Sequence, residues 1–266
     1  MVPILLEEPD DAMRLRPLPA FEDNYIWALH DETGAGLVVD PGEAGPVLAA
    51  VAGGLQLRGI LLTHHHHDHI GGVPGIVEHF PGLPVIGPHD ERIATATQRV
   101  GAGEVARIGD WVFEVHEIPG HTVSHIAFHG HQVLFCGDTL FSLGCGRLFE
   151  GTPTQMLDSL DRLSALPGDA RVCCGHEYTV ANAAFALAVD PLNESLQRRA
   201  VDAKRQRLEG RATVPSTLAQ ERDCNPFLRI DAAPVRAAVD AHAGRATTDR
   251  VDTFAELRRW KDGYRA

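Results

Sequence analysis

Short runs in which hydrophobic and polar residues alternate fill the first two thirds of the chain, and such runs are typical of β-strands. We predict strands at residues 15–20, 24–30, 37–40, 57–62, 84–86, 111–118, 124–129, 132–136 and 170–174. Gly130 and His131 join two of these strands, which predicts a hairpin. Helices are predicted at 46–51, at 72–80, and from Thr152-Pro153 to about residue 166. The expected fold class is therefore α/β or α+β.

The pattern changes after His176. Residues 181–188 are rich in alanine, residues 192–208 show helical periodicity with many charges, and residues 252–262 form a last helix. Asn225-Pro226-Phe227 marks a turn inside this region. Because strand patterns stop here, we predict two domains: a catalytic domain at 1–178 and a helical domain at 179–266.

The composition excludes some classes of partner. Of the 266 residues, 36 are acidic and 24 are basic, for a formal net charge of -12, whereas a surface that binds nucleic acid needs clustered Lys and Arg. No apolar run reaches the length of about 18 residues that spans a bilayer. The first eleven residues are acidic (Glu7, Glu8, Asp10, Asp11), where a secretory signal would be basic. We expect no nucleic acid or membrane partner and no export.

The cysteines indicate a reducing environment. There are 5, with no C-x-x-C pair and one left over, so neither a disulfide framework nor a thiolate zinc site is predicted. Cys136, Cys173 and Cys174 lie in apolar strand-like runs, where a free cysteine packs as a small core residue. We therefore expect the protein to be cytoplasmic. Separately, we expect it to be a monomer.

A dense group of histidines, Thr63 to His69 (T-H-H-H-H-D-H), follows the predicted strand at 57–62. Neutral imidazoles and carboxylates are ligands that borderline divalent metals prefer. Residues two apart at a strand end can point to one locus, so His64 and His66 would face one ion, and Asp68 and His69 a second position close by. The alternatives are a histidine-rich surface tract or an expression tag, but tags lie at chain ends.

His121, Asp138 and His176 each follow directly after a predicted strand. Loops at strand ends are where a layered fold builds its site. Taken singly, the three residues could be a turn residue, a helix cap and a satisfied histidine. Together they supply the ligands that two ions would still lack, since each ion needs about three protein ligands.

These motifs carry a resemblance. T-H-x-H-x-D-H, a later histidine, the aspartate of G-D-T and the histidine of C-G-H-E-Y resemble the metallo-β-lactamase superfamily and, within it, glyoxalase II, the hydroxyacylglutathione hydrolases. The resemblance implies a four-layer αββα sandwich with a C-terminal helical domain. It implies two divalent metal ions, expected to be zinc, with iron or manganese as alternatives. The implied ligands are His64, His66 and His121 for one ion, Asp68, His69 and His176 for the other, and Asp138 as the bridge.

The resemblance extends into the helical third. Residues 141–151, 176–179, 225–229 and 258–262 match later motifs of the family. It implies that Arg147, Arg258 and Lys261 hold the glycine carboxylate of glutathione and that Tyr178 contacts the tripeptide. Some members have a lysine and a second contacting tyrosine where this chain has Arg147 and Phe149. Without the resemblance, Arg258 and Lys261 would simply be basic residues on a solvated helix face.

The implied activity is hydrolysis of a glutathione thioester, S-D-lactoylglutathione, to glutathione and D-lactate, the second step of methylglyoxal detoxification. A water between two cations would have its pKa lowered towards neutrality, so no serine or cysteine nucleophile is required. Asp68 and Asp138 would be the catalytic carboxylates. Two other readings remain open: a single-iron, persulfide dioxygenase-like enzyme, and a non-catalytic metal-binding module of the same fold.

Overall fold

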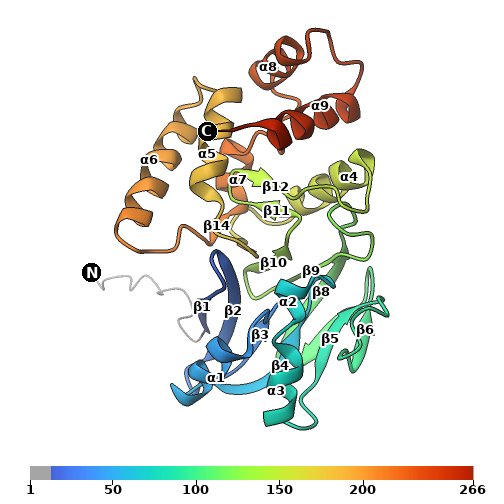
Figure 1. Cartoon of the computed structure of the whole chain (residues 1–266), viewed down its shortest axis with the longest axis vertical. Helices are drawn as coiled ribbons and strands as arrows, with labels where there is room; N and C mark the ends of the chain where they lie inside the picture. The colour runs from blue at the N-terminus through green and yellow to red at the C-terminus, as the bar shows by residue number, and fades with distance from the viewer. Residues whose placement is uncertain (1–12, 266) are drawn as a thin grey trace, which may run out of the picture.

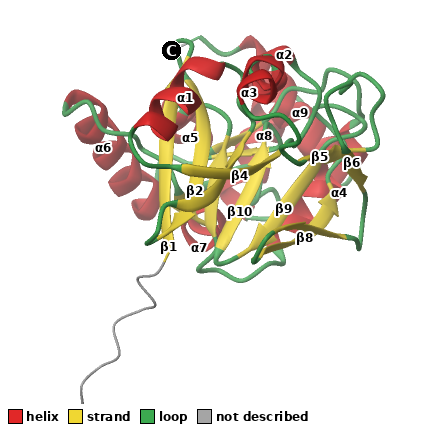
Figure 2. Cartoon of the chain, turned by 90° about the horizontal axis from the view of Figure 1, so that it is seen from below, coloured by secondary structure: helices red, strands yellow, loops and turns green. Residues whose placement is uncertain are grey.

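The structure, a computed structural model, describes residues 13–265. Two six-stranded sheets pack against each other, with helices on both outer sides (Figures 1 and 2). This confirms the four-layer sandwich that the family resemblance implies. The acidic segment at residues 1–11 lies outside the described residues.

The first sheet is built from the N-terminal half of the chain. Its strand order is β1-β2-β3-β4-β5-β6, with antiparallel pairing from β1 to β3 and parallel pairing from β3 to β6. Its strands are β1 (Met13–Ala20), β2 (Asn24–Asp31), β3 (Ala35–Val39), β4 (Gln56–Leu61), β5 (Val85–Pro88) and β6 (Gln98–Val100).

The second sheet follows in the chain and has the order β14-β13-β10-β9-β8-β7. Its strands are β7 (Val105–Ile108), β8 (Trp111–Glu117), β9 (Ile126–Gly130), β10 (Val133–Gly137), β13 (Arg171–Cys174) and β14 (Ser216–Thr217). A separate pair, β11 (Leu140–Phe141) and β12 (Gly144–Cys145), lies beyond the end of β10.

Helices form the outer layers. Beside the first sheet lie α1 (Ala44–Ala52), α2 (His67–Ile70) and α3 (Val73–His79), and α4 (Pro153–Ser164) packs on the second sheet. The C-terminal helices gather at the opposite end of the molecule from α1 and α3 (Figure 1): α5 (Thr179–Val189), α6 (Glu194–Leu208), α7 (Leu218–Cys224), α8 (Ala233–Ala243) and α9 (Arg250–Gly263).

Successive side chains of β2 point to opposite faces of the first sheet, and each face is covered by its own hydrophobic core. Trp27 and Leu29 point into the core between the sheets, whereas Ile26 and Ala28 point to the core under α1 and α3. All four are at most 2% exposed, so this strand is buried on both faces and its sequence is apolar almost throughout. The sheets also bond at one edge, where the Tyr25 N–H donates to the Gly175 carbonyl (2.8 Å) and the Ile126 N–H to that of Thr63 (3.0 Å).

One expectation for the C-terminal third is wrong. Residues 216–217 form β14, which pairs antiparallel with β13 and so completes the second sheet. Two residues are too few for the alternating pattern by which a strand is recognised. The same reason explains why the short elements β6, β11, β12 and α2 were not predicted. Among residues 13–265, no helix has the length and apolar character needed to cross a membrane.

Candidate metal centre

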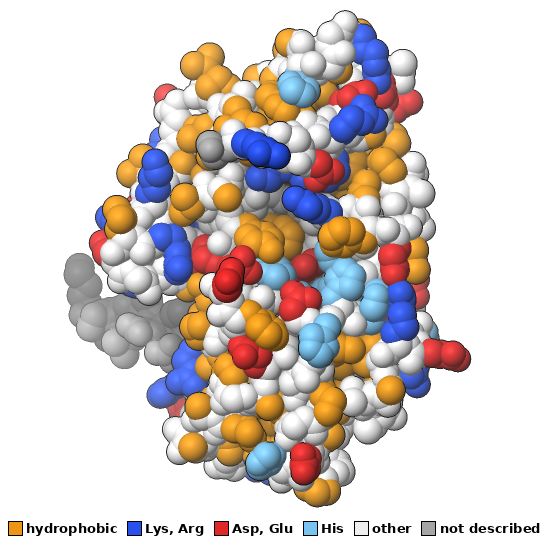
Figure 3. Space-filling model, in the orientation of Figure 1, with side chains coloured by type: hydrophobic (Ala, Val, Ile, Leu, Met, Phe, Trp, Pro, Cys, Tyr) orange, Lys and Arg blue, Asp and Glu red, His pale blue; other side chains and the backbone are white. Residues whose placement is uncertain are grey.

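The ends of four strands meet at one edge of the sandwich. The segment 63–69 follows β4 of the first sheet, whereas His121, Asp138 and His176 follow β8, β10 and β13 of the second. In Figure 3, histidine and carboxylate side chains gather near the middle of the molecular face, with Lys and Arg side chains directly above them. All seven predicted ligand residues therefore lie together, although more than a hundred positions separate the first from the last.

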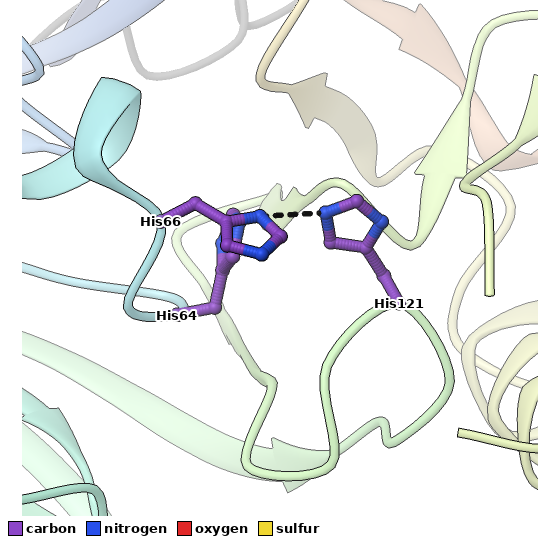
Figure 4. A group of neighbouring side chains, drawn as sticks. All are labelled: His64, His66 and His121. Carbon is purple, nitrogen blue, oxygen red and sulfur yellow. Dashed lines mark hydrogen bonds between the residues drawn. The ribbon is translucent and has the colours of Figure 1, made fainter. Parts of the chain in front are cut away.

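Three imidazoles form the first ligand group. Nδ1 of His66 lies 3.1 Å from Nε2 of His64 and 3.0 Å from Nε2 of His121. His64 and His66 come from one segment and His121 from a loop opposite, and their ring nitrogens converge (Figure 4). The three nitrogens form a set of donor atoms close enough to hold one ion.

Asp68, His69 and His176 form a second group of possible ligands. Oδ2 of Asp68 lies 3.6 Å from Nε2 of His69 and 3.4 Å from Nε2 of His176. Both imidazoles are buried, and the Asp68 carboxylate is fixed by the side-chain amide of Asn24, which donates to Oδ2 (3.0 Å).

Asp138 lies between the two groups. Its Oδ1 is 3.4 Å from Nε2 of His69, and its Oδ2 is 3.2 Å from Nε2 of His176 and 3.5 Å from Nε2 of His121. One buried carboxylate thus reaches both donor sets, which is the placement expected of a bridging ligand.

A layer of acceptors around the site orients the imidazoles, and sequence reasoning did not find it. Asp40, just after β3, accepts the Thr63 N–H (2.8 Å) and hydroxyl (2.7 Å) and faces Nδ1 of His69 (3.1 Å). Asp23 faces Nδ1 of His176 (2.8 Å), and the carbonyl of residue 147 faces Nδ1 of His121 (3.0 Å). An acceptor at Nδ1 favours the tautomer whose Nε2 lone pair is directed into the site.

His125 is a further buried residue that the sequence did not single out. Its ring stacks on that of His64 (4.5 Å, 15°), and its Nε2 accepts the Asp138 N–H (3.2 Å). Gly175 is required nearby, because a Cβ there would lie 2.6 Å from both Oδ1 of Asp138 and Cε1 of His69. The protein therefore packs closely around the donor atoms, with no room for a larger side chain at residue 175.

The electrostatics differ between the two groups. Burial, together with the neighbouring histidines, holds the pKa of His64 well below its usual value and lowers the pKa of His66 to about 4, so both are neutral at pH 7. Burial also acts to lower the pKa of His176, but the Asp138 carboxylate outweighs it and raises the pKa to about 10. His176 therefore keeps a proton beside the Asp138 carboxylate, and a metal cation bound to the same nitrogen would replace that proton.

The donors fit divalent metal ions. Nε2 of His69 and Oδ1 of Asp138 are buried and have no hydrogen-bond partner within the protein. Orphaned polar atoms in such a place are costly unless a ligand satisfies them. Neutral imidazoles and carboxylates in two sets of three, with a shared carboxylate, are a donor set for borderline divalent cations.

A cavity of about 550 Å³ opens from the two donor groups towards the C-terminal helices. Its wall includes four residues predicted to bind substrate: Arg147, Tyr178, Arg258 and Lys261. The ring of Tyr178 stacks on that of His176 (4.7 Å, 5°), which places a phenol directly beside the site. Phe149 also lines the cavity, 63% exposed, with its ring 5.1 Å from that of His121.

The basic residues of the wall are held differently. Arg258 is buried, and its guanidinium donates to the Cys145 carbonyl (2.8 Å) and to Asp262 (3.0 Å). Arg147 is exposed, with Nε 3.7 Å from Asp262. Burial, followed by the charge of Arg258, lowers the pKa of Lys261 to about 8. These three basic residues line the cavity together with a single nearby carboxylate, that of Asp262, so this part of the wall carries a net positive charge that suits an anionic ligand.

His65 turns away from the donor groups, as its position between the two ligand residues predicts. Its Nδ1 lies 3.4 Å from Asp90 and its Nε2 lies 3.7 Å from Glu150. Glu150 also pairs with Arg92 and accepts the Val123 N–H (2.9 Å). These contacts connect the segment 63–69 to the loop that carries His121.

Comparison with protein families gives two matches that together span nearly the whole chain. Residues 22–176 match the metallo-beta-lactamase superfamily, and residues 177–264 match the hydroxyacylglutathione hydrolase C-terminus. The chain is 59% identical over 254 residues to a hydroxyacylglutathione hydrolase of Stenotrophomonas maltophilia, covering 96% of this chain and 100% of the relative. It is 56% identical over 255 residues to one of Xanthomonas campestris pv. campestris, again covering 96% and 100%.

Solved structures share the fold at lower identity. ETHE1 from Myxococcus xanthus has a TM-score of 0.63 at 26% identity, covering 94% of this chain and 90% of that one. TTHA1623 in a di-iron-bound form has a TM-score of 0.57 at 26% identity, covering 80% of this chain and 100% of that one. The two family matches and the full-length relatives agree, and the chain belongs to the hydroxyacylglutathione hydrolase family of the metallo-beta-lactamase superfamily.

Proposed function

We propose that the protein hydrolyses S-D-lactoylglutathione to glutathione and D-lactate at the metal centre described above. The observation that carries the proposal is the position of one buried carboxylate, Asp138, within 3.5 Å of imidazole nitrogens from both donor groups, at the floor of a cavity lined by cations. The full-length relatives named hydroxyacylglutathione hydrolase support it.

In this proposal His64, His66 and His121 would hold one divalent cation, Asp68, His69 and His176 would hold the other, and Asp138 would be a ligand shared by both. When bound, the cations supply an activated water and a polarised thioester carbonyl. His69 and His176 hold the pKa of the Asp138 carboxyl well below its usual range despite its burial, so Asp138 is an anion at pH 7. It accepts hydrogen bonds but donates none, which orients a water beside it. The departing thiolate needs little or no general acid.

Arg147, Arg258 and Lys261 bind the glycine carboxylate of the substrate in this proposal. Burial of Arg258 and partial burial of Lys261 strengthen such a contact, because fewer water molecules screen the charges. Tyr178 contacts the tripeptide beside His176. Binding the remote carboxylate positions the thioester carbonyl over the metal centre, so a thioester without the glycine residue should react more slowly.

The metals are proposed to be zinc, and iron and manganese suit the same donors. The di-iron form of one structural neighbour supports a two-metal centre. Five buried free cysteines support a reducing, cytoplasmic location. We further propose that the chain acts as a monomer and that its substrate-binding part begins at residue 179, after a catalytic part at 1–178.

The test combines metal analysis with turnover of S-D-lactoylglutathione on the same purified sample. Two metal ions per chain, with hydrolysis that disappears on chelation and returns when ions are restored, would support the proposal. One iron with consumption of oxygen would instead favour a persulfide dioxygenase. Metal binding without either reaction would favour a non-catalytic module.

A further inference from the structure

A second group of metal-binding side chains lies on the outer face of the second sheet. Glu114 and His116 are two apart on β8 and so project from the same side of the strand. His129 on β9 pairs directly with Glu114 in the antiparallel register. None of the three lines the cavity of the metal centre.

The three side chains converge. One donor atom from each, two imidazole nitrogens and a carboxylate oxygen, lies within 4.8 Å of the other two. Nε2 of His116 is 3.9 Å from Oε2 of Glu114, and the imidazole rings of His116 and His129 are 6.1 Å apart. No other set of three such donors outside the centre already described occurs in residues 13–265.

His116 shows why a ligand is expected there. Its Nε2 is buried and has no hydrogen-bond partner in the protein, although 19% of the side chain is exposed. A buried nitrogen without a partner is costly unless an ion or water satisfies it. The lone pair of a neutral imidazole nitrogen in this position is free to coordinate an ion.

We propose that Glu114, His116 and His129 form a third metal site, for a late first-row divalent ion such as zinc, nickel or cobalt. Two imidazoles and one carboxylate, completed by water, are a recurring ligand set for such ions. Ligand atoms around one tetrahedral ion are roughly 3.4 Å apart at bond lengths of about 2.1 Å. Since the donor atoms lie within 4.8 Å of one another, no pair must close in by more than about 1.4 Å. The Glu114 side chain, 72% exposed, has room to do so.

One nearby charge opposes the ion. Arg162 on α4 lowers the pKa of His116 through its positive charge, and its guanidinium donates to the carbonyl of Glu117. The Arg162 side chain is exposed and can move away from an incoming cation. Replacing Arg162 by alanine should therefore tighten binding at this site.

An ion at this site would tie β8 to β9. β8 ends four residues before His121, so the ion would also stiffen the strand that leads to the metal centre. Anything that binds only the folded state stabilises it, so the thermal midpoint should rise with the ion concentration.

The experiment uses the full chain carrying its resident metals, dialysed against buffered free Zn²⁺, with metal per chain measured by mass spectrometry. The wild-type protein should take up one further equivalent. Glu114→Gln, His116→Gln and His129→Gln should lose this equivalent at the same free Zn²⁺ and keep their hydrolytic rate. Glu114→Gln changes an exposed side chain and keeps the test valid if a histidine variant misfolds. His89→Gln is the matched control, because His89 faces a single carboxylate, Glu104, at 3.7 Å.

The thermal midpoint gives an independent readout. Zn²⁺ should raise that of the wild type by about 2 °C or more above that of His129→Gln. Absence of a further equivalent in the wild type at micromolar free Zn²⁺ would overturn the proposal. A further equivalent that persists in all three ligand variants would place the ion elsewhere and overturn it too.

Discussion

Asp40 contributes to the orientation of both donor groups of the metal centre. Its carboxylate accepts from the backbone and hydroxyl of Thr63 and from His69, and Thr63 in turn contacts Nδ1 of His64 (3.0 Å). Both donor groups therefore depend on this side chain. It is held in the left-handed region (φ 53°), where Asp and Asn are tolerated better than most residues.

Asp40→Asn should keep the backbone conformation but remove the negative charge that His69 faces. Loss of such an outer partner typically costs about 10- to 100-fold in metal affinity or activity. We expect kcat/KM and metal content to fall together in this variant. Asp110→Asn, at a turn residue on the surface, is a suitable control. Normal metal content with normal turnover in Asp40→Asn would mean that the hydrogen bonds to Asp40 do not position the ligands.

Lys261 gives the substrate cavity a dependence on pH. Since burial lowers its pKa to about 8, Lys261 is charged below that pH and becomes neutral above it. We expect KM for S-D-lactoylglutathione to rise as the pH increases through about 8, because one of the three cations proposed to bind the glycine carboxylate is lost. Lys261→Arg keeps its charge at these pH values and should show a flatter profile. An equally steep rise in both proteins would assign the pH dependence to another group.

The sequence was enough to bring together the residues that we propose as metal ligands, whereas it did not reveal the residues that orient them. His64, His121, Asp138 and His176 each follow a strand whose pattern is visible in the sequence, and this places them at one edge. Asp23, Asp40 and His125 also lie near strand ends, but nothing in their local sequence separates them from turn residues. Their partners lie between 13 and 153 positions away, and only the folded register brings them together.

At the scale of single elements, α4 shows how a local signal carries over into structure. Thr152 caps the helix, with the Gln155 N–H donating to its hydroxyl (3.2 Å) and the Thr152 N–H donating to the Gln155 side chain (2.9 Å). The preceding residue, Gly151, bonds to the Gly120 carbonyl next to His121 (3.0 Å). The start of α4 therefore also fixes a loop of the site.

Thr152→Ala should destabilise the protein by about 1 kcal/mol, because it removes the hydroxyl that accepts the Gln155 N–H. For a chain of this size, that corresponds to a fall of roughly 2–4 °C in the thermal midpoint. Thr152→Ser keeps the hydroxyl and should unfold close to the wild-type temperature. A midpoint that does not change in the alanine variant would show that water satisfies the helix start equally well.

Most elements with long patterns were predicted within a few residues, although the 11-residue helix α8 was missed, and short elements that depend on neighbouring segments were not predicted. The prediction for β2 ends one residue before the strand does, because a largely apolar run of this length between polar residues is readily recognised as a strand. β14 has only two residues, and its pairing with β13 is set by the fold of the segment after α6. Tertiary contacts, rather than propensity, create such strands.

At the scale of the molecule, the two predicted domains share one core. Phe185 of α5, Phe254 of α9 and Phe227 of the turn between α7 and α8 belong to the same buried cluster as Trp27 and Phe113 of the sheets. β14 adds a strand to the second sheet, and Arg250 at the start of α9 pairs with Asp161 of α4 (2.8 Å). The C-terminal third therefore shares a hydrophobic core and a sheet with the sandwich and does not form a separate unit.

The full chain should accordingly unfold in a single cooperative transition, and a fragment that ends at residue 178 should not fold stably. Removing residues 179–266 would expose apolar side chains of the sheets that are now buried against the C-terminal helices. Calorimetry of the full chain and circular dichroism of the fragment check this expectation. Two separate transitions, or a fragment with native near-ultraviolet signals, would show that the division at 178 is also a division in stability.

Each donor group combines residues that follow strands of both sheets. In one group, His64 and His66 follow the first sheet and His121 follows the second. In the other group, Asp68 and His69 follow the first sheet and His176 follows the second. A nascent chain therefore offers no complete pocket for a cation while it is still being synthesised. We therefore expect metal uptake to follow the docking of the two halves of the sandwich, because the donor atoms for each ion come together only then.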